Sequence, residues 1–182
     1  MKRDPAHTHR RLRRSLRRLM DEGSLPDALR EVAALPARQG VNPLIGFLCD
    51  REERVRWRAV ALLGRVVASL AEEAPESARV VMRRLMWSLN DESGGIGWGA
   101  PEAMGAILAR SPLLAREYTA ILVSYIRPDG NYLEHPGLQR GLLWGLARLG
   151  QARPACLGGV GEALAPFLSS PDPAARGLAA TY

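Results

Sequence analysis

The chain has 182 residues, of which 47% are hydrophobic and 24% charged, as in a folded globular protein rather than a disordered one. No apolar run is long enough to span a membrane, and no apolar segment follows the charged start. We therefore expect a cytoplasmic protein with no membrane partner. Cys49 and Cys156 have no paired spacing, which favours a reducing compartment and two buried thiols.

The formal net charge of +6 is concentrated at the amino terminus. Residues 1–20 carry eight basic side chains and one acid, whereas the remainder of the chain holds 17 basic and 18 acidic groups. Leu12, Leu16, Leu19 and Met20 form one apolar stripe among these arginines. We expect the stripe to cap the open end of the fold. The alternative is a basic arm, in which residues 2–18 make a weak contact with nucleic acid or an acidic partner.

The remaining chain consists of segments of ten to twenty residues with apolar positions three and four apart, separated by Pro, Gly and Ser. Ser24 before Pro26, and Ser111 before Pro112, place capping oxygens and early prolines where helices begin. Long alternating runs are absent, so strands are not expected. The predicted helices are 5–22, 25–36, 42–49, 52–72, 75–90, 99–110, 112–127, 136–150, 153–169 and 172–182.

One helix–turn–helix pattern recurs through most of the chain. Its first two copies align without a gap, so that Trp57 matches Trp98 and Gly64 matches Gly105 at the same offset. In the third copy Gly145 stands at the place of this repeated glycine. The small residues predict close packing between successive helix pairs, whose apolar faces are buried only by stacking. The copies are residues 49–64, 90–105, 138–145 and 164–180.

The pattern LIGFLCDREERVRWRAVALLG, which ends at Gly64, resembles a HEAT-type repeat, including the short HEAT-like repeats of phycobilisome lyases. The last copy matches similarly, with Asp172 in the turn and Arg176 in the helix, whereas the two middle copies lack the Val-Arg pair. The whole chain also resembles small bacterial HEAT-repeat proteins of unassigned role. The resemblance covers about residues 42–182.

This resemblance implies an all-α fold, a right-handed α-α superhelix or HEAT/armadillo-like solenoid of about five helix pairs. We expect a single repeat domain over residues 1–182. Residues 1–22 are its basic capping helix, and residues 42–182 form about four helix-pair repeats.

The turns inside the two middle pairs are longer than the others. NDESGGIG and RPDGNYLEHPG stand where the outer pairs have DREER and SSPDP. Insertions in neighbouring repeats gather on one edge of a solenoid, where binding surfaces usually lie. We therefore predict a site for a protein partner or small ligand at these turns and the helix starts behind them. Its residues are Trp87, Asp91, Glu92, Ser93, Trp98, Glu102, Asn131, Tyr132, Glu134, His135, Arg140 and Trp144.

A purely structural explanation of the same residues is the alternative. In that explanation Asp91 caps a helix, the glycines close a turn, and the tryptophan rings fill the core between repeats, as the match of Trp98 with Trp57 suggests. Specific chemistry has little support. GGIGWG does not fit a phosphate-binding motif, and His135, the one histidine outside the amino-terminal segment, has no second ligand at helical spacing.

The sequence therefore predicts no catalytic residue, no metal and no cofactor. We favour a non-catalytic binding or adaptor module that uses the enlarged central turns. The alternative is an enzyme on a HEAT-like scaffold. The resemblance implies a lyase acting on bilins or tetrapyrroles, or less well a DNA glycosylase, because residues 21–182 have no positive surplus with which to hold phosphates.

Overall fold

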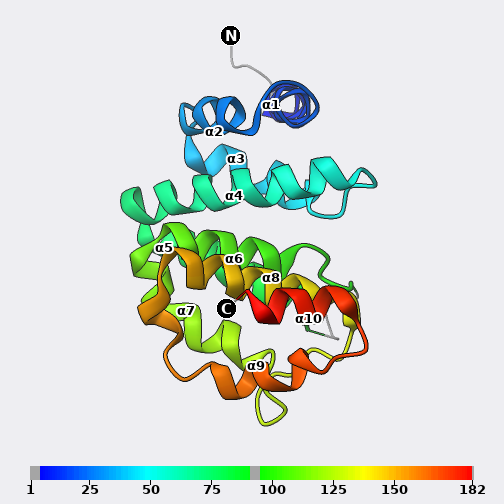
Figure 1. Ribbon diagram of the computed structural model, residues 1–182. Coiled ribbons are helices and arrows are strands. Elements are labelled where there is room, and N and C mark those ends of the chain that lie inside the picture. Colours follow the sequence, from blue (N-terminus) through cyan, green and yellow to red (C-terminus); the bar gives the residue numbers. More distant parts are fainter. Residues whose placement is uncertain (1–4, 91–94, 182) are drawn as a thin grey trace.

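The computed structural model describes residues 5–90 and 95–181, and in this part of the chain all regular structure is helical, without strands (Figure 1). The predicted fold class is confirmed. The elements are α1 (Pro5–Asp21), α2 (Leu25–Ala33), α3 (Ala37–Phe47), α4 (Glu53–Glu73), α5 (Pro75–Trp87), α6 (Ala100–Arg110), α7 (Pro112–Ser124), α8 (Pro136–Ala152), the 3-10 helix η2 (Pro154–Leu157), α9 (Gly161–Leu168) and α10 (Pro173–Ala180).

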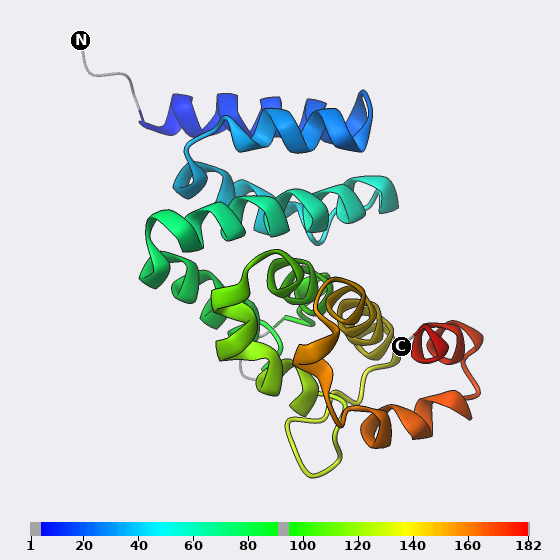
Figure 2. The ribbon, with the colours of Figure 1, turned by 60° about the vertical axis from the view of Figure 1, so that its left-hand side comes forward.

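The α-helices of the described residues form successive pairs stacked into a right-handed superhelix. In the even-numbered layer, α2 packs on α4, α4 on α6, α6 on α8 and α8 on α10. Figures 1 and 2 show α1 and α2 at one end of the stack and α9 and α10 at the other. A helix pair alone leaves an apolar face exposed, and stacking joins these faces into one core that runs from Leu16 to Ala179.

Two predicted helix starts are confirmed by their caps. The Ser24 hydroxyl accepts a hydrogen bond from the backbone N–H of Asp27 at 3.2 Å. The Ser111 hydroxyl accepts one from Leu114 at 3.3 Å. Each serine satisfies an N–H group that the first helical turn leaves free.

Two predicted boundaries are wrong. Helix α3 begins at Ala37 rather than at residue 42 and continues past Pro43, because Ala37 and Val41 are buried against the core and this packing outweighs the donor that proline lacks. The predicted helix 153–169 is divided into η2 and α9. Gly159, between them, has φ of +79°, a left-handed conformation that interrupts a right-handed helix.

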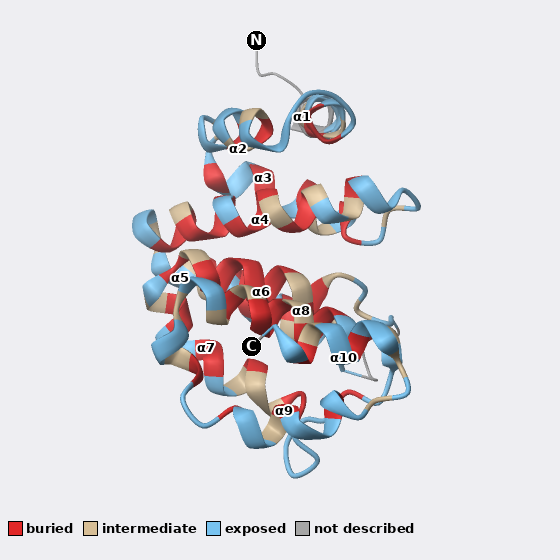
Figure 3. Ribbon diagram, in the orientation of Figure 1, coloured by how far each residue is buried: buried red, intermediate tan, exposed pale blue. Residues whose placement is uncertain are grey.

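Glycines bring the central helices into close contact. A Cβ atom added to Gly105 would lie 2.5 Å from the carbonyl oxygen of Gly145, and one added to Gly64 would lie 3.0 Å from that of Ala106. The predicted match of Gly64, Gly105 and Gly145 therefore corresponds to packing between α4, α6 and α8. Helix α6, between its neighbours, is buried along most of its length (Figure 3).

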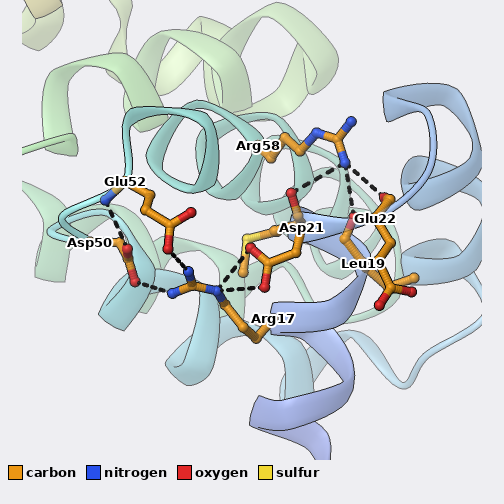
Figure 4. Close-up of polar contacts among 8 residues, drawn as sticks. Arg17, Leu19, Asp21, Glu22, Asp50, Glu52 and Arg58 are labelled. Atoms are coloured by element: carbon orange, nitrogen blue, oxygen red, sulfur yellow. Dashed lines mark hydrogen bonds and ion pairs between the residues drawn. The ribbon is translucent and has the colours of Figure 1, made fainter.

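The amino-terminal helix packs on α3 and α4 through its apolar stripe, with Leu16 and Met20 completely buried. The Arg58 guanidinium on α4 holds the end of α1 by donating to backbone carbonyls (Figure 4). Its acceptors are Leu19, Met20, Glu22 and Gly23, at 2.7–3.2 Å.

Two arginines of α1 also contact the rest of the fold. Arg17 forms ion pairs with Asp21 on its own helix and with Asp50 and Glu52 in the turn after α3 (Figure 4). The Arg13 guanidinium lies 4.8 Å from the centre of the Phe47 ring.

None of the helices among residues 5–90 and 95–181 is both long and apolar enough to cross a membrane.

Candidate functional site

Arginines close the two short turns of the repeat. In the first repeat, Arg56 donates to the carbonyls of Asp50 and Arg51 at 2.8 and 3.1 Å. In the last, Arg176 donates in the same way to the carbonyls of Ser170 and Pro171 at 2.7 and 3.2 Å. The arginine at this place in the repeat therefore holds each short turn to the helix that follows it.

Glycines occupy the equivalent positions in the two middle repeats. Gly97 stands where the first repeat has Arg56, and Gly137 holds the same place in the third copy. Gly97 and Gly99 have φ of +73° and +75°, which only glycine adopts without strain. Without the arginine clamp the turns are longer and expose other side chains. Asp91, Glu92 and Ser93 of the predicted site lie outside the described residues.

Hydrogen bonds hold the second long turn in one conformation. The backbone N–H of Leu133 donates to the carbonyl of Tyr125 at 3.0 Å, and the Asn131 amide donates to the Ser124 hydroxyl at 2.9 Å. The Gln139 amide on α8 donates to the Tyr132 hydroxyl and to the carbonyl of Leu133 at 2.9 and 2.8 Å. This turn therefore presents its side chains without a large cost of ordering on binding.

The described parts of the two long turns and the ends of α5 and α7 line an open cleft of about 1030 Å³. Three large apolar side chains at this cleft are exposed: Trp87 by 54%, Ile96 by 48% and Tyr132 by 40%. Polar groups make up at least as much of the lining as apolar ones, a mixture that is common at binding surfaces for protein partners. The walls consist of Arg83, Met86, Trp87, Leu89, Asn90, Gly95, Ile96, Ile121, Tyr125, Gly130, Asn131, Tyr132, Leu133, Glu134, His135 and Leu138.

The structure brings about half of the predicted site residues together. The predicted residues that line the cleft are Trp87, Asn131, Tyr132, Glu134 and His135. Trp98 lies beside it, with its ring in edge contact with His135 at a centroid distance of 5.0 Å. His135 also begins α8, where its Nδ1 accepts from the N–H of Gly137 at 3.0 Å.

The other described members of the predicted set lie away from the cleft. Arg140 forms an ion pair with Asp172 in the last short turn. Trp144 packs against Trp57, with ring centroids 4.8 Å apart. Glu102 lies on α6 against α8, where a Cβ atom added to Gly141 would be 2.5 Å from its Oε1. These three residues belong to the even-numbered layer rather than to the long turns.

The alternative explanation, in which the Trp98 ring is buried between repeats, does not match its exposure. Its side chain is 41% exposed, and Trp57, which it matches in the repeat, is 38% exposed. The rings lie at the layer surface because glycines and alanines already fill the space between the helices. The two thiols are likewise not fully buried: Cys49 is exposed, although its thiol lies 3.8 Å from the carbonyl oxygen of Trp98.

Sequence reasoning missed Arg83 and Met86 on α5 and Asn90 just after this helix, which line the cleft together with the predicted Trp87. The sequence places these residues at helical spacing with Trp87, at positions 83, 86, 87 and 90. This spacing could have indicated the site, but it is also typical of a stripe that faces the core. Arg83 is held by an ion pair with Glu76 at 2.7 Å. Burial raises the pKa of Tyr125, another residue that lines the cleft.

Glu102 is a buried carboxyl group with an unsatisfied oxygen. Within the described part of the chain its Oε2 has no hydrogen-bond partner. Burial raises the pKa of Glu102 above the ordinary value of 4.5, against the opposing effects of a backbone hydrogen bond and the Arg56 charge. The group therefore destabilises the fold when it is ionised.

We expect Glu102→Gln to stabilise the protein at neutral pH and not in acid. In the wild type, the unfolded chain loses this proton at a lower pH than the folded chain, so stability falls as pH rises from about 4 through the raised pKa. The variant lacks this loss, and its free energy of unfolding should exceed that of the wild type by about 1 kcal/mol at pH 7.

Urea denaturation at pH 4 and pH 7 measures this difference. Glu162→Gln, at an exposed position on α9, is the control and should match the wild type at both pH values. Equal stability of Glu102→Gln and wild type at pH 7 would contradict an ionised, desolvated carboxyl group at this position.

Comparison with known proteins adds support for the fold. No family model matches the chain. Over 71 residues it is 39% identical to an uncharacterized protein of Archaeoglobus fulgidus, and the aligned part is 39% of this chain but only 36% of that protein. The match thus spans little more than a third of the relative's length.

Among solved structures, an engineered protein superposes on 93% of the chain and 76% of its own length, with a TM-score of 0.51 and 17% identity. A designed armadillo repeat protein covers 91% of the chain and 78% of its own length, with a TM-score of 0.47 and 19% identity. At such low identity, the likeness to the engineered protein concerns the helical repeat fold alone.

Proposed function

We propose that the protein is a non-catalytic binding module that recognises a segment of a protein partner in the cleft at the two long turns. The observation that carries this proposal is the group of exposed apolar side chains, Trp87, Ile96 and Tyr132, around one hollow. Leaving such side chains in water is unfavourable, and they gain most from a partner that covers them.

The chemistry of the cleft describes the segment that fits it. Aromatic and aliphatic walls favour one or two large apolar side chains of the partner. Asn90, Asn131 and Glu134 at the rim offer amide and carboxylate groups for the partner's backbone N–H groups or a basic side chain. A peptide with apolar anchors and a neighbouring lysine or arginine combines these features.

Selection of peptides from a displayed random library against the full chain tests the proposal. We expect enrichment of apolar peptides with a basic residue, and about a hundredfold weaker binding of these peptides to the double variant Trp87→Ala, Tyr132→Ala, since buried aromatic anchors each contribute about 1–2 kcal/mol or more. The folded state of the variant is checked by circular dichroism, because both rings are exposed and their loss should leave the fold intact.

Val80→Ala is the matched control. Val80 is 52% exposed on α5, the helix that carries Trp87, but it does not line the cleft. Its replacement should leave peptide affinity unchanged. Selected peptides that bind the double variant as tightly as the wild type would move the recognition surface elsewhere.

We further propose that the chain is a single HEAT-like repeat domain related to the small repeat proteins that its motif resembles, and that it acts in the cytoplasm. The closure of the short turns by Arg56 and Arg176 supports this kinship. The exposed Arg10, Arg14 and Arg18 on α1 support a second, weak contact with nucleic acid or an acidic partner.

A further inference from the structure

Three arginines lie on adjacent helices of the even-numbered layer, away from the cleft. Arg65 on α4 is exposed, and Arg110 on α6 and Arg148 on α8 are half-buried. The glycine contacts set the helix register: Gly64 packs on Ala106, and Gly105 packs on Gly145. Each arginine lies within about one helical turn of these contacts, so the three side chains start at similar heights on neighbouring helices.

Side chains of α4 and α8 can meet across α6. The rings of Trp57 on α4 and Trp144 on α8 are in contact, with centroids 4.8 Å apart, although α6 packs between the two helices. This contact is possible because α6 is rich in glycine and alanine on the packed surface. Arg148 is one turn from Trp144 on the same side of α8, and its charge acts on Arg110.

No ion pair within the described part of the chain neutralises the positive charges of this group. Among residues 5–90 and 95–181, none of the three guanidiniums has an ion pair or hydrogen bond with another side chain. Burial, and then the charges of Arg148 and Arg65, lower the pKa of Arg110. Arg153 adds a fourth guanidinium nearby, which donates its Nε–H to the carbonyl of Leu108 in the last turns of α6 at 3.1 Å.

An ordinary structural role does not explain the whole group. A cation at the end of a helix is stabilised by the helix dipole, and this accounts for Arg110 in the last turn of α6. Arg65 and Arg148 do not lie in the last turns of their helices and gain nothing from this effect. A half-buried Arg110 whose charge is opposed by those of Arg148 and Arg65 is instead expected where an anion binds.

We propose that Arg65, Arg110 and Arg148 form a binding site for a phosphate group of a small molecule. Guanidiniums present paired N–H donors that match phosphate oxygens, and a dianionic monoester neutralises most of the local charge. A nucleic-acid backbone fits less well. It needs an extended positive track, whereas residues 21–182 hold 17 basic and 18 acidic groups.

Thermal unfolding of the full chain with pyrophosphate, and with sodium chloride at equal ionic strength, tests the site. Pyrophosphate should raise the melting temperature of the wild type beyond the effect of chloride. Arg148→Gln, which has no helix-dipole contribution to lose, should melt higher than the wild type without pyrophosphate, because repulsion is relieved, and Arg110→Gln is the second variant. Each should also bind pyrophosphate about tenfold or more weakly by calorimetry.

The controls separate this site from other arginines. Arg116→Gln on α7 and the double variant Arg10→Gln, Arg14→Gln on α1 change exposed positions outside the group and should keep the wild-type response. The proposal is overturned by any of three results: no specific response of the wild type, a response that survives Arg110→Gln, or a response that is lost in the α1 variant. Tighter binding of a DNA oligonucleotide than of pyrophosphate through Arg110 would overturn the assignment to a small molecule.

Discussion

Gly105→Ala should destabilise the protein by about 3 kcal/mol, although alanine favours a helix over glycine by about 1 kcal/mol. The added methyl group would lie 2.5 Å from the carbonyl oxygen of Gly145 and 2.6 Å from its carbonyl carbon. Both are backbone atoms of α8, so no side-chain rotation removes the clash. Helices α6 and α8 must move apart, and the central packing of the stack is lost. The midpoint of urea denaturation measures the change.

Gly177→Ala is the matched control, because it makes the same change at a helical position with open space around it. A Cβ atom at Gly177 on α10 meets no other atom within 4 Å. This variant should be more stable than the wild type by about 0.5–1 kcal/mol. If Gly105→Ala also stabilises the protein, then α6 and α8 are not in close contact at Gly105 and Gly145.

Arg58→Ala should cost about 2 kcal/mol, because it removes the charged group that binds the end of α1. Its guanidinium donates to four backbone carbonyls at 2.7–3.2 Å, and alanine leaves these acceptors without their shared donor. The loss should appear first as faster amide hydrogen exchange in α1 and α2, since the rest of the stack keeps its own contacts.

Arg54→Ala is the control for Arg58→Ala. Arg54 is exposed on the same helix, and its replacement should change the free energy of unfolding by no more than about 0.5 kcal/mol. Equal exchange rates of α1 in the Arg58→Ala variant and the wild type would show that the apolar stripe alone holds this helix.

The repeat could be recognised from the sequence because its marks are local. Ser24 and Ser111 each accept a hydrogen bond from a backbone N–H three residues later, so both caps are local. The matching glycines indicate which helices pack closely. The boundaries that were wrong depend on distant contacts. Burial of Ala37 extends α3 through Pro43, an effect that no window of neighbouring residues contains.

The candidate site was predictable only in part for a similar reason. The length of the two central turns indicated Tyr132 and His135, since insertions in successive repeats lie on one edge. Which tryptophan faces the cleft depends on the layer in which its helix packs. Trp87 lines it, whereas Trp144 packs on Trp57 in the other layer.

By itself, the sequence determined the helices, the repeat spacing and the edge on which the turns are enlarged, because capping, periodicity and chain connectivity act between near neighbours. Only the tertiary structure decided which charges act together. After residue 20 the basic and acidic groups are almost equal in number, so the net charge does not indicate the group of Arg65, Arg110 and Arg148. These residues come from three repeats, and the charges of Arg65 and Arg148 act on Arg110 because glycines bring their helices into contact. Electrostatic energy depends on distance in space, and net charge contains no distances.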